Sequence, residues 1–97
     1  MAASWSAESA PRLILLDLKI EGMSGLEVLK QLKNEERTRQ IPVVIITGTA
    51  TEEEMRECYR LGVNSYVLKP AHPKQFAQVV GDIAHYWLTV NCPVHSK

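Results

Sequence analysis

The sequence predicts an α/β fold built on a small parallel sheet. The chain of 97 residues repeats one unit three times, an apolar strand-like run followed by an amphipathic helix-like run. The first two strand-like runs are apolar at every position, which is typical of strands covered on both faces. We therefore expect three parallel strands with three helices in one domain over residues 13–90. An irregular leader over residues 1–12 and a tail over residues 91–97 flank this domain.

Each predicted strand ends at a polar side chain. The strands cover residues 13–16, 42–46 and 65–68, and they are followed by Asp17, Thr47 and Lys69. Because the carboxyl ends of parallel strands meet at one edge of a sheet, these three side chains are expected to face one crevice.

The predicted helices begin at clear start signals. Ser24 with Glu27 and Thr51 with Glu54 fit the capping box, and Pro73 suits the first position of the third helix. The first two helices are expected over residues 24–35 and 51–61, with Gly62 ending the second. The faces expected to pack inward carry Gly25, Val28, Leu29 and Leu32, then Met55, Cys58 and Tyr59, and finally Phe76, Val79, Val80, Ile83 and Trp87.

Composition excludes several classes of protein. Eleven basic and eleven acidic residues leave no net charge, which argues against binding to nucleic acid or to an anionic membrane. No apolar run approaches the roughly 20 residues of a membrane helix, and residues 1–10 do not resemble a secretory signal. We therefore expect a cytoplasmic protein.

The cysteines and histidines show no pattern of a special site. Two cysteines form no disulfide framework; Cys58 is expected in the core and Cys92 at the surface. The histidines, at positions 72, 85 and 95, lack metal-ligand spacing.

Two interpretations of the polar strand ends remain open at this point. A carboxylate, a hydroxyl and an ammonium in one crevice suit a phosphoryl group, with Asp17 as nucleophile and Lys69 neutralising phosphate oxygens. Alternatively, Asp17 and Thr47 simply end their strands, and Lys69 forms a structural ion pair with Asp17.

Three motifs, in order along the chain, connect these residues to a known family. They are Leu-Leu-Asp-Leu-Lys-Ile-Glu-Gly-Met-Ser-Gly-Leu-Glu at 15–27, Pro-Val-Val-Ile-Ile-Thr at 42–47 and Gly-Val-Asn-Ser-Tyr-Val-Leu-Lys-Pro at 62–70. From Leu13 to about Trp87 the sequence resembles the receiver domains of bacterial response regulators, which have a flavodoxin-like fold.

The resemblance implies a role for each site residue. Asp17 would accept the phosphoryl group, and the Thr47 hydroxyl would move toward that group. Lys69 would be its cationic partner, and Tyr66 would be the switch aromatic. Asp17 and the backbone carbonyl of Lys19 would bind Mg²⁺. The protein would then be a two-component phosphorelay module without enzymatic activity of its own, phosphorylated by a histidine kinase. Its ending at residues 85–88 resembles single-domain receivers that pair with phytochrome-type kinases.

The resemblance also implies that elements are missing. Only twelve residues precede Leu13, whereas a βαβ unit needs about 30. We therefore expect an N-terminally truncated receiver without the acidic pair that binds the metal, since Glu8 is the sole carboxylate there. Mg²⁺ binding and phosphorylation of the isolated chain should be weak.

The same shortfall predicts an open apolar strand edge over residues 13–16, and hence a homodimer. A phosphate-independent dimerisation or protein-interaction scaffold is therefore the alternative function.

Overall fold

The expected parallel sheet is present. A computed structural model describes residues 11–20 and 22–93, so nearly all of the predicted leader, including Glu8, and residues 94–97 of the predicted tail lie outside the described residues. The strands β1 (Ile14–Asp17), β4 (Val43–Thr47) and β5 (Ser65–Leu68) lie parallel in the order β1-β4-β5. The fold class and the three parallel strands are confirmed, while β1 and β4 each begin and end one residue later than predicted and so include the polar residue.

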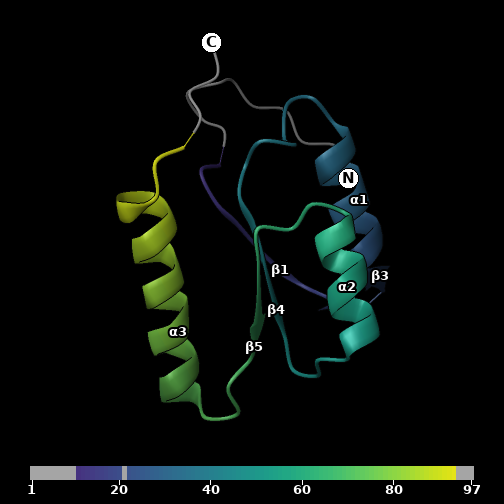
Figure 1. The fold of residues 1–97 in the computed structure, drawn as a ribbon. Coiled ribbons are helices and arrows are strands. Elements are labelled where there is room, and N and C mark those ends of the chain that lie inside the picture. Colours follow the sequence, from purple (N-terminus) through teal and green to yellow (C-terminus); the bar gives the residue numbers. More distant parts are fainter. Residues whose placement is uncertain (1–10, 21, 94–97) are drawn as a thin grey trace.

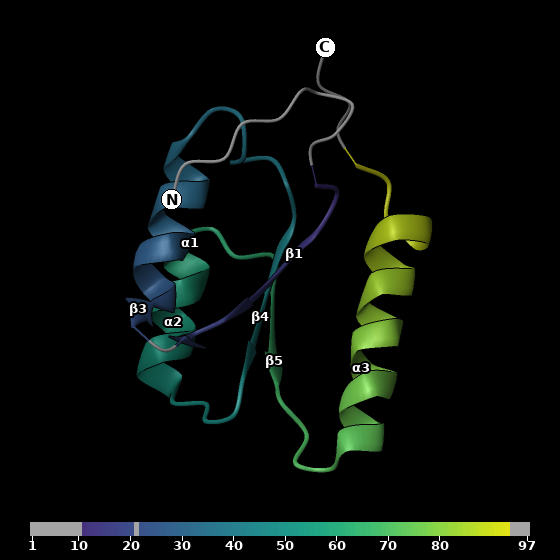
Figure 2. The same cartoon turned by 180° about the vertical axis from the view of Figure 1, so that it is seen from behind.

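Helices cover both faces of this sheet. The helices α1 (Gly25–Asn34) and α2 (Glu52–Arg60) lie on one side, and α3 (Pro73–His85) lies on the other (Figures 1 and 2). A π-helical turn, η2 (Tyr86–Val90), continues α3. None of the helices in the described ranges is long and apolar enough to cross a membrane.

The helix start signals act as predicted. The Ser24 hydroxyl accepts the Glu27 amide at 3.4 Å, and the Thr51 hydroxyl accepts the Glu54 amide at 3.1 Å. Both bonds satisfy amide groups that the first helical turn leaves without a partner. Gly62 has φ +103°, the left-handed conformation that ends α2 without the strain a side chain would cause.

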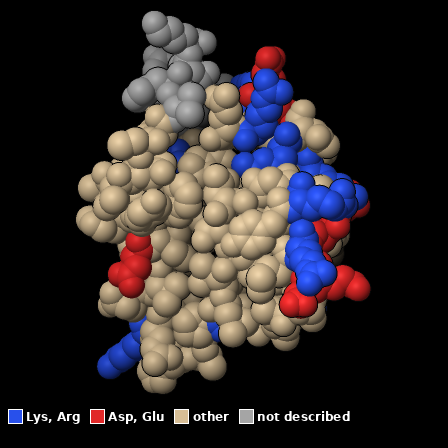
Figure 3. Space-filling model, viewed as in Figure 1, with Lys and Arg blue, Asp and Glu red and all other residues tan. Residues whose placement is uncertain are grey.

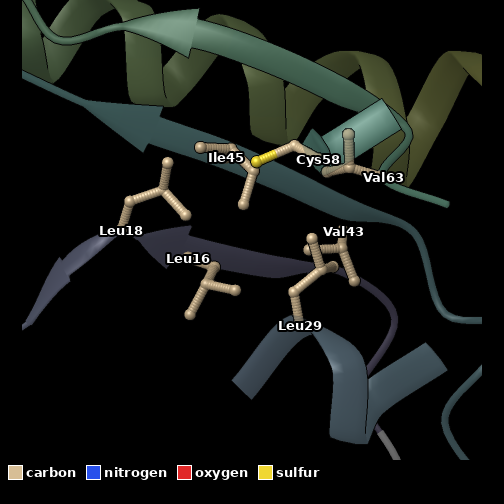
Figure 4. Close-up of a cluster of buried hydrophobic side chains, with 7 residues drawn as sticks. All are labelled: Leu16, Leu18, Leu29, Val43, Ile45, Cys58 and Val63. Atoms are coloured by element: carbon tan, nitrogen blue, oxygen red, sulfur yellow. The ribbon is translucent and has the colours of Figure 1, made fainter. Parts of the chain in front are cut away.

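The core lies between the sheet and the α1/α2 layer. Figure 4 shows side chains from β1 and β4 packed with Leu29 of α1 and Cys58 of α2, both of which are fully buried. The buried cluster consists of Leu16, Leu18, Leu29, Val43, Ile45, Cys58 and Val63. All five residues of β4 are buried, as expected for the central strand.

The α3 face is less completely buried than the sequence predicted. No residue of α3 is buried, so its predicted inward face, including Phe76 and Ile83, is only partly covered. Tyr59, expected on the inner face of α2, is 51% exposed. That expectation was wrong because α2 packs on the sheet through the face that contains Cys58, and Tyr59 lies outside this face.

β1 has a strand neighbour on one side only among the described residues. Leu15, in the middle of β1, is 39% exposed. The predicted open edge is therefore present in this part of the chain, although Leu16 next to it is buried.

One small element was not predicted. The segments β2 (Lys19–Ile20) and β3 (Met23–Ser24) form an antiparallel pair between β1 and α1, and Gly22 in the connection has φ +77°. This pair folds the chain back so that α1 begins close to the end of β1.

A tightly bonded cluster lies at the opposite end of the sheet, where β4 begins. The Lys33 ammonium donates to the carbonyls of Arg39 and Ile41 and to Asn64 Oδ1, at 3.2, 3.3 and 3.2 Å. Asn64 Oδ1 also accepts the buried amide of Val43 at 2.9 Å. Burial lowers the pKa of Lys33 below its ordinary value. This cluster fixes the loop after α1 to the start of the sheet.

Candidate functional site

The carboxyl ends of the three parallel strands bring the predicted polar residues to one edge. Asp17 is the last residue of β1 and lies opposite Ile46, one position before Thr47 at the end of β4. Lys69 follows β5 directly, and its amide donates to the Thr47 carbonyl at 2.6 Å. The edge that parallel topology predicts is therefore where these residues lie.

The Asp17 carboxylate is held by two groups. Its Oδ1 accepts the backbone amide of Lys19 at 2.9 Å, and its Oδ2 lies 3.6 Å from the Lys69 ammonium. The two side chains are 36% and 40% exposed. The carboxylate is thus oriented by the backbone and still open to a reagent from solvent.

Gly25 allows α1 to begin beside the chain that follows Asp17. A Cβ atom at this position would lie 2.5 Å from Leu18 Cα and 2.8 Å from the Asp17 carbonyl oxygen, both main-chain atoms. The Gly25 amide also donates to the Leu18 carbonyl at 3.2 Å. This close contact fixes the path of the main chain directly after the acidic residue.

Lys69 reaches two other groups from its place after β5. Its ammonium forms the ion pair with Asp17 and also lies 5.2 Å from the centre of the Phe76 ring on α3. An ion pair this exposed contributes at most about 1 kcal/mol to stability. The pair with Asp17 therefore does little to stabilise the fold.

Thr47 ends β4 at this edge, and its hydroxyl is bonded within the loop that follows. It is fully buried, and its hydroxyl donates to the Thr49 carbonyl at 3.1 Å within the loop after β4. The structure brings Asp17 and Lys69 together directly, whereas Thr47 joins them through its backbone. For its hydroxyl to contact a group on Asp17, this bond to Thr49 has to break.

Tyr66 packs against the core below the edge and carries an unsatisfied polar atom. Its hydroxyl is buried without a hydrogen-bond partner among the described residues, and the same holds for Oε1 of Glu54 on α2. Burial raises the pKa of Tyr66 above its ordinary value, and charge at Cys58 and Glu54 acts in the same direction. A buried hydroxyl without a partner is costly, so this ring has a reason to change position.

Among the described residues, Asp17 is a candidate side-chain ligand for a magnesium ion at this edge. Within residues 11–20 and 22–93, no group of three or more acidic, histidine or cysteine side chains is placed to hold a metal. Asp17 is the one carboxylate that the described edge supplies, beside the predicted backbone carbonyl of Lys19. Magnesium prefers six oxygen ligands, of which protein carboxylates commonly supply one or two.

Two features of the site region were missed by reasoning from sequence. The β2–β3 pair is too short to give a periodic signal, and the turn at Gly22 was not predicted. The contact between Lys69 and Phe76 was missed because Phe76 was assigned only to the packing face of the third helix.

The match to a known family covers most of the chain. A family model described as "Response regulator receiver domain" matches residues 1–81. The probable methanogenesis regulatory protein FilR2 of Methanothrix harundinacea is 42% identical over 83 residues, which are 86% of this chain and 54% of that protein. Response regulator Rcp1 of Synechocystis sp. is 38% identical over 84 residues, 86% of this chain and 57% of Rcp1.

Solved structures give the same result. The phosphorylated cyanobacterial phytochrome response regulator RcpA has a TM-score of 0.84 at 35% identity, covering 92% of this chain and 64% of RcpA. The Mn²⁺-bound form of Rcp1 has a TM-score of 0.79 at 34% identity, covering 88% of this chain and 61% of that one. This chain therefore spans between about half and two thirds of the length of each.

Proposed function

The chain belongs to the response regulator receiver domain family, and from this we propose that Asp17 accepts a phosphoryl group from a histidine kinase. One observation carries the proposal: Asp17 Oδ2 lies 3.6 Å from the Lys69 ammonium at the carboxyl edge of a parallel sheet. The chain would act as an acceptor and a switch rather than as an enzyme.

The proposed transfer uses groups that the edge already holds. An oxygen of the Asp17 carboxylate attacks phosphorus of a phosphohistidine, the P–N bond breaks, and its electron pair returns to the imidazole nitrogen. The product is an acyl phosphate, and Lys69 is near enough to neutralise one of its oxygens. The Lys19 amide keeps the carboxylate oriented during attack.

We expect Mg²⁺ to bind this chain weakly, through Asp17 and the Lys19 backbone carbonyl. The single carboxylate described at this edge supports that expectation. Phosphorylation should accordingly be slow, because little positive charge besides Lys69 offsets the charge that develops on the phosphoryl group.

The proposed response involves Thr47 and Tyr66. A phosphoryl group on Asp17 offers oxygens that compete for the Thr47 hydroxyl, now bonded to Thr49. Movement of Thr47 would free space for the Tyr66 ring. Because the buried Tyr66 hydroxyl makes no hydrogen bond to the described residues, the ring would break none of these bonds when it moves. The face formed by α2, β5 and α3 would then change shape.

Figure 3 shows charged side chains at the α1/α2 side of this view and few over its centre and α3.

The kinase partner is proposed from the relatives. The neighbour RcpA is a phytochrome response regulator, which supports a phytochrome-type histidine kinase as the partner of this chain. The absence of net charge supports a chain that binds neither nucleic acid nor an anionic membrane, and we expect it in the cytoplasm with its kinase.

A second candidate function is a homodimeric scaffold that does not need phosphate. It is favoured by the edge of β1, which lacks a second neighbour among the described residues and exposes Leu15. The other sheet edge, β5, exposes Leu68 at 57%.

Light scattering over a range of concentrations should detect a dimer. Leu15→Lys would disrupt pairing at β1, and Leu68→Glu would disrupt a dimer formed through β5.

Acetyl phosphate with magnesium tests the acceptor function. Intact-protein mass spectrometry should show slow gain of one phosphate by the wild-type chain, and none by Asp17→Asn. Equal gain in both proteins would contradict Asp17 as the acceptor. No gain in the wild type, together with a stable dimer, would favour the scaffold.

A further inference from the structure

The contacts of Lys69 extend from the acidic residue to the start of α3. Its amide is anchored to the Thr47 carbonyl, while its ammonium lies 3.6 Å from Asp17 Oδ2 and 5.2 Å from the centre of the Phe76 ring. Phe76 is the fourth residue of α3, and its own amide donates to the His72 carbonyl at 2.9 Å. Lys69 thus joins β4 through its backbone and joins β1 to α3 through its side chain.

We propose that Phe76 is a positioning residue that keeps the Lys69 ammonium beside Asp17, an inference that rests on the proposed phosphoryl transfer. A lysine has four rotatable side-chain bonds, and an exposed ion pair at 3.6 Å does little to restrict them. An aromatic face within about 6 Å attracts a cation through its quadrupole. The ring therefore gives the Lys69 ammonium a second contact besides the carboxylate.

The same contact makes α3 sensitive to the state of Asp17. No residue of α3 is buried, so this helix is held less firmly than α1 or α2, which each bury at least one residue. A phosphoryl group on Asp17 adds negative charge and draws the ammonium toward it, which changes the attraction between Lys69 and the ring. Because such coupling is reciprocal, altering the ring also alters how the ammonium meets the phosphoryl group.

Three substitutions separate the ring from simple packing. Phe76→Leu removes the π face and keeps an apolar side chain. Phe76→Tyr keeps the ring. Ile83→Leu is the matched control, because Ile83 is also partly buried on α3 and lies about two turns further along the helix.

The first measurement is independent of phosphorylation. In the unmodified protein, NMR should show the Lys69 ε-methylene protons shifted upfield by the ring current of Phe76. The shift should persist in Phe76→Tyr and Ile83→Leu and be lost in Phe76→Leu. Absence of the shift in the wild type would overturn the inference.

The second measurement is the rate of phosphorylation by acetyl phosphate. Phe76→Leu should be slower by about two- to fivefold, the effect of a cation–π contact of ordinary strength, while Phe76→Tyr restores the rate. Equal rates in Phe76→Leu and Ile83→Leu would overturn the inference and leave Asp17 as acceptor. If the wild type gains no phosphate, the proposed function fails, and the ring-current shift alone decides whether Phe76 positions Lys69.

Discussion

The two ends of the sheet each hold a lysine, but in different ways. At the end where β4 begins, Lys33 donates to three oxygens, and at the other end Lys69 has one carboxylate at 3.6 Å and one aromatic ring. The first ammonium has its donors satisfied by protein and serves the fold. The second has one carboxylate acceptor at 3.6 Å among the described residues, so it keeps donors for the anion that the proposed function brings to this edge.

Removing the Lys69 ammonium should give the largest effect in this comparison. We expect Lys69→Met to slow phosphorylation of Asp17 by about 100-fold, because the developing phosphate charge loses its cationic contact. The free energy of unfolding should change by no more than about 1 kcal/mol, since the ion pair is exposed. Acetyl phosphate kinetics and urea denaturation measure the two quantities. A large loss of stability with an unchanged phosphorylation rate would mean that Lys69 serves the fold rather than phosphoryl transfer.

At the end of the sheet where β4 begins, we expect a substitution to lower stability and to leave the phosphorylation rate unchanged. Asn64→Ala leaves the buried Val43 amide without its acceptor and takes one acceptor from Lys33. The free energy of unfolding should fall by about 2 kcal/mol, while the phosphorylation rate stays as in the wild type. Asn64→Asp, which keeps an oxygen at this position, is the control in the same denaturation experiment. If Asn64→Ala slowed phosphorylation by tenfold, the two ends would not be independent.

A smaller effect is expected between the two ends, at Tyr66. Phe lacks the buried hydroxyl that has no described partner, so Tyr66→Phe should raise the free energy of unfolding by up to about 1 kcal/mol. Urea denaturation checks this, with Tyr59→Phe, which changes an exposed ring, as the matched control. A loss of stability would mean that the Tyr66 hydroxyl has a partner in solution.

The smallest effect concerns pH. Burial raises the pKa of Cys58 above 9.0, with Glu54 and Glu57 acting in the same direction. Its stabilising contribution is therefore complete below pH 9 and is lost as pH rises through the folded-state pKa. Lys33 acts oppositely, because its pKa is lowered and the cost of burying its charge disappears as pH rises.

Denaturation between pH 8 and 10.5 tests these signs. Cys58→Ala should flatten the alkaline loss of stability, whereas Lys33→Met should steepen it. An unchanged pH dependence in Cys58→Ala would mean that the buried thiol does not titrate in this range.

Much of the fold and the main pair of site residues followed from sequence. Uninterrupted apolar runs gave the parallel strands, Ser24 and Thr51 gave the helix starts, and the common edge of the sheet joined Asp17 to Lys69. These features depend on local periodicity, on capping and on one topological rule. Each could be inferred without knowing any three-dimensional distance.

The features that sequence did not predict depend on contacts between distant residues. Lys33 meets Asn64 across 31 positions, and no local pattern distinguishes this lysine from an exposed one. The sequence did not show that the Thr47 hydroxyl donates to the carbonyl of Thr49, two residues away. Nearby backbone acceptors compete for a hydroxyl, and a strand pattern does not show which one binds it.

The close approach at Gly25 limits how this region can evolve. A side chain at Gly25 would meet main-chain atoms of Asp17 and Leu18, which cannot rotate away as a flexible side chain could. Exchanges of side chains in the short segment between Asp17 and α1 leave this contact in place, whereas an insertion there would displace the helix start from the chain that it contacts. Gly25 thus constrains the length and path of this loop although it has no side chain to offer the site.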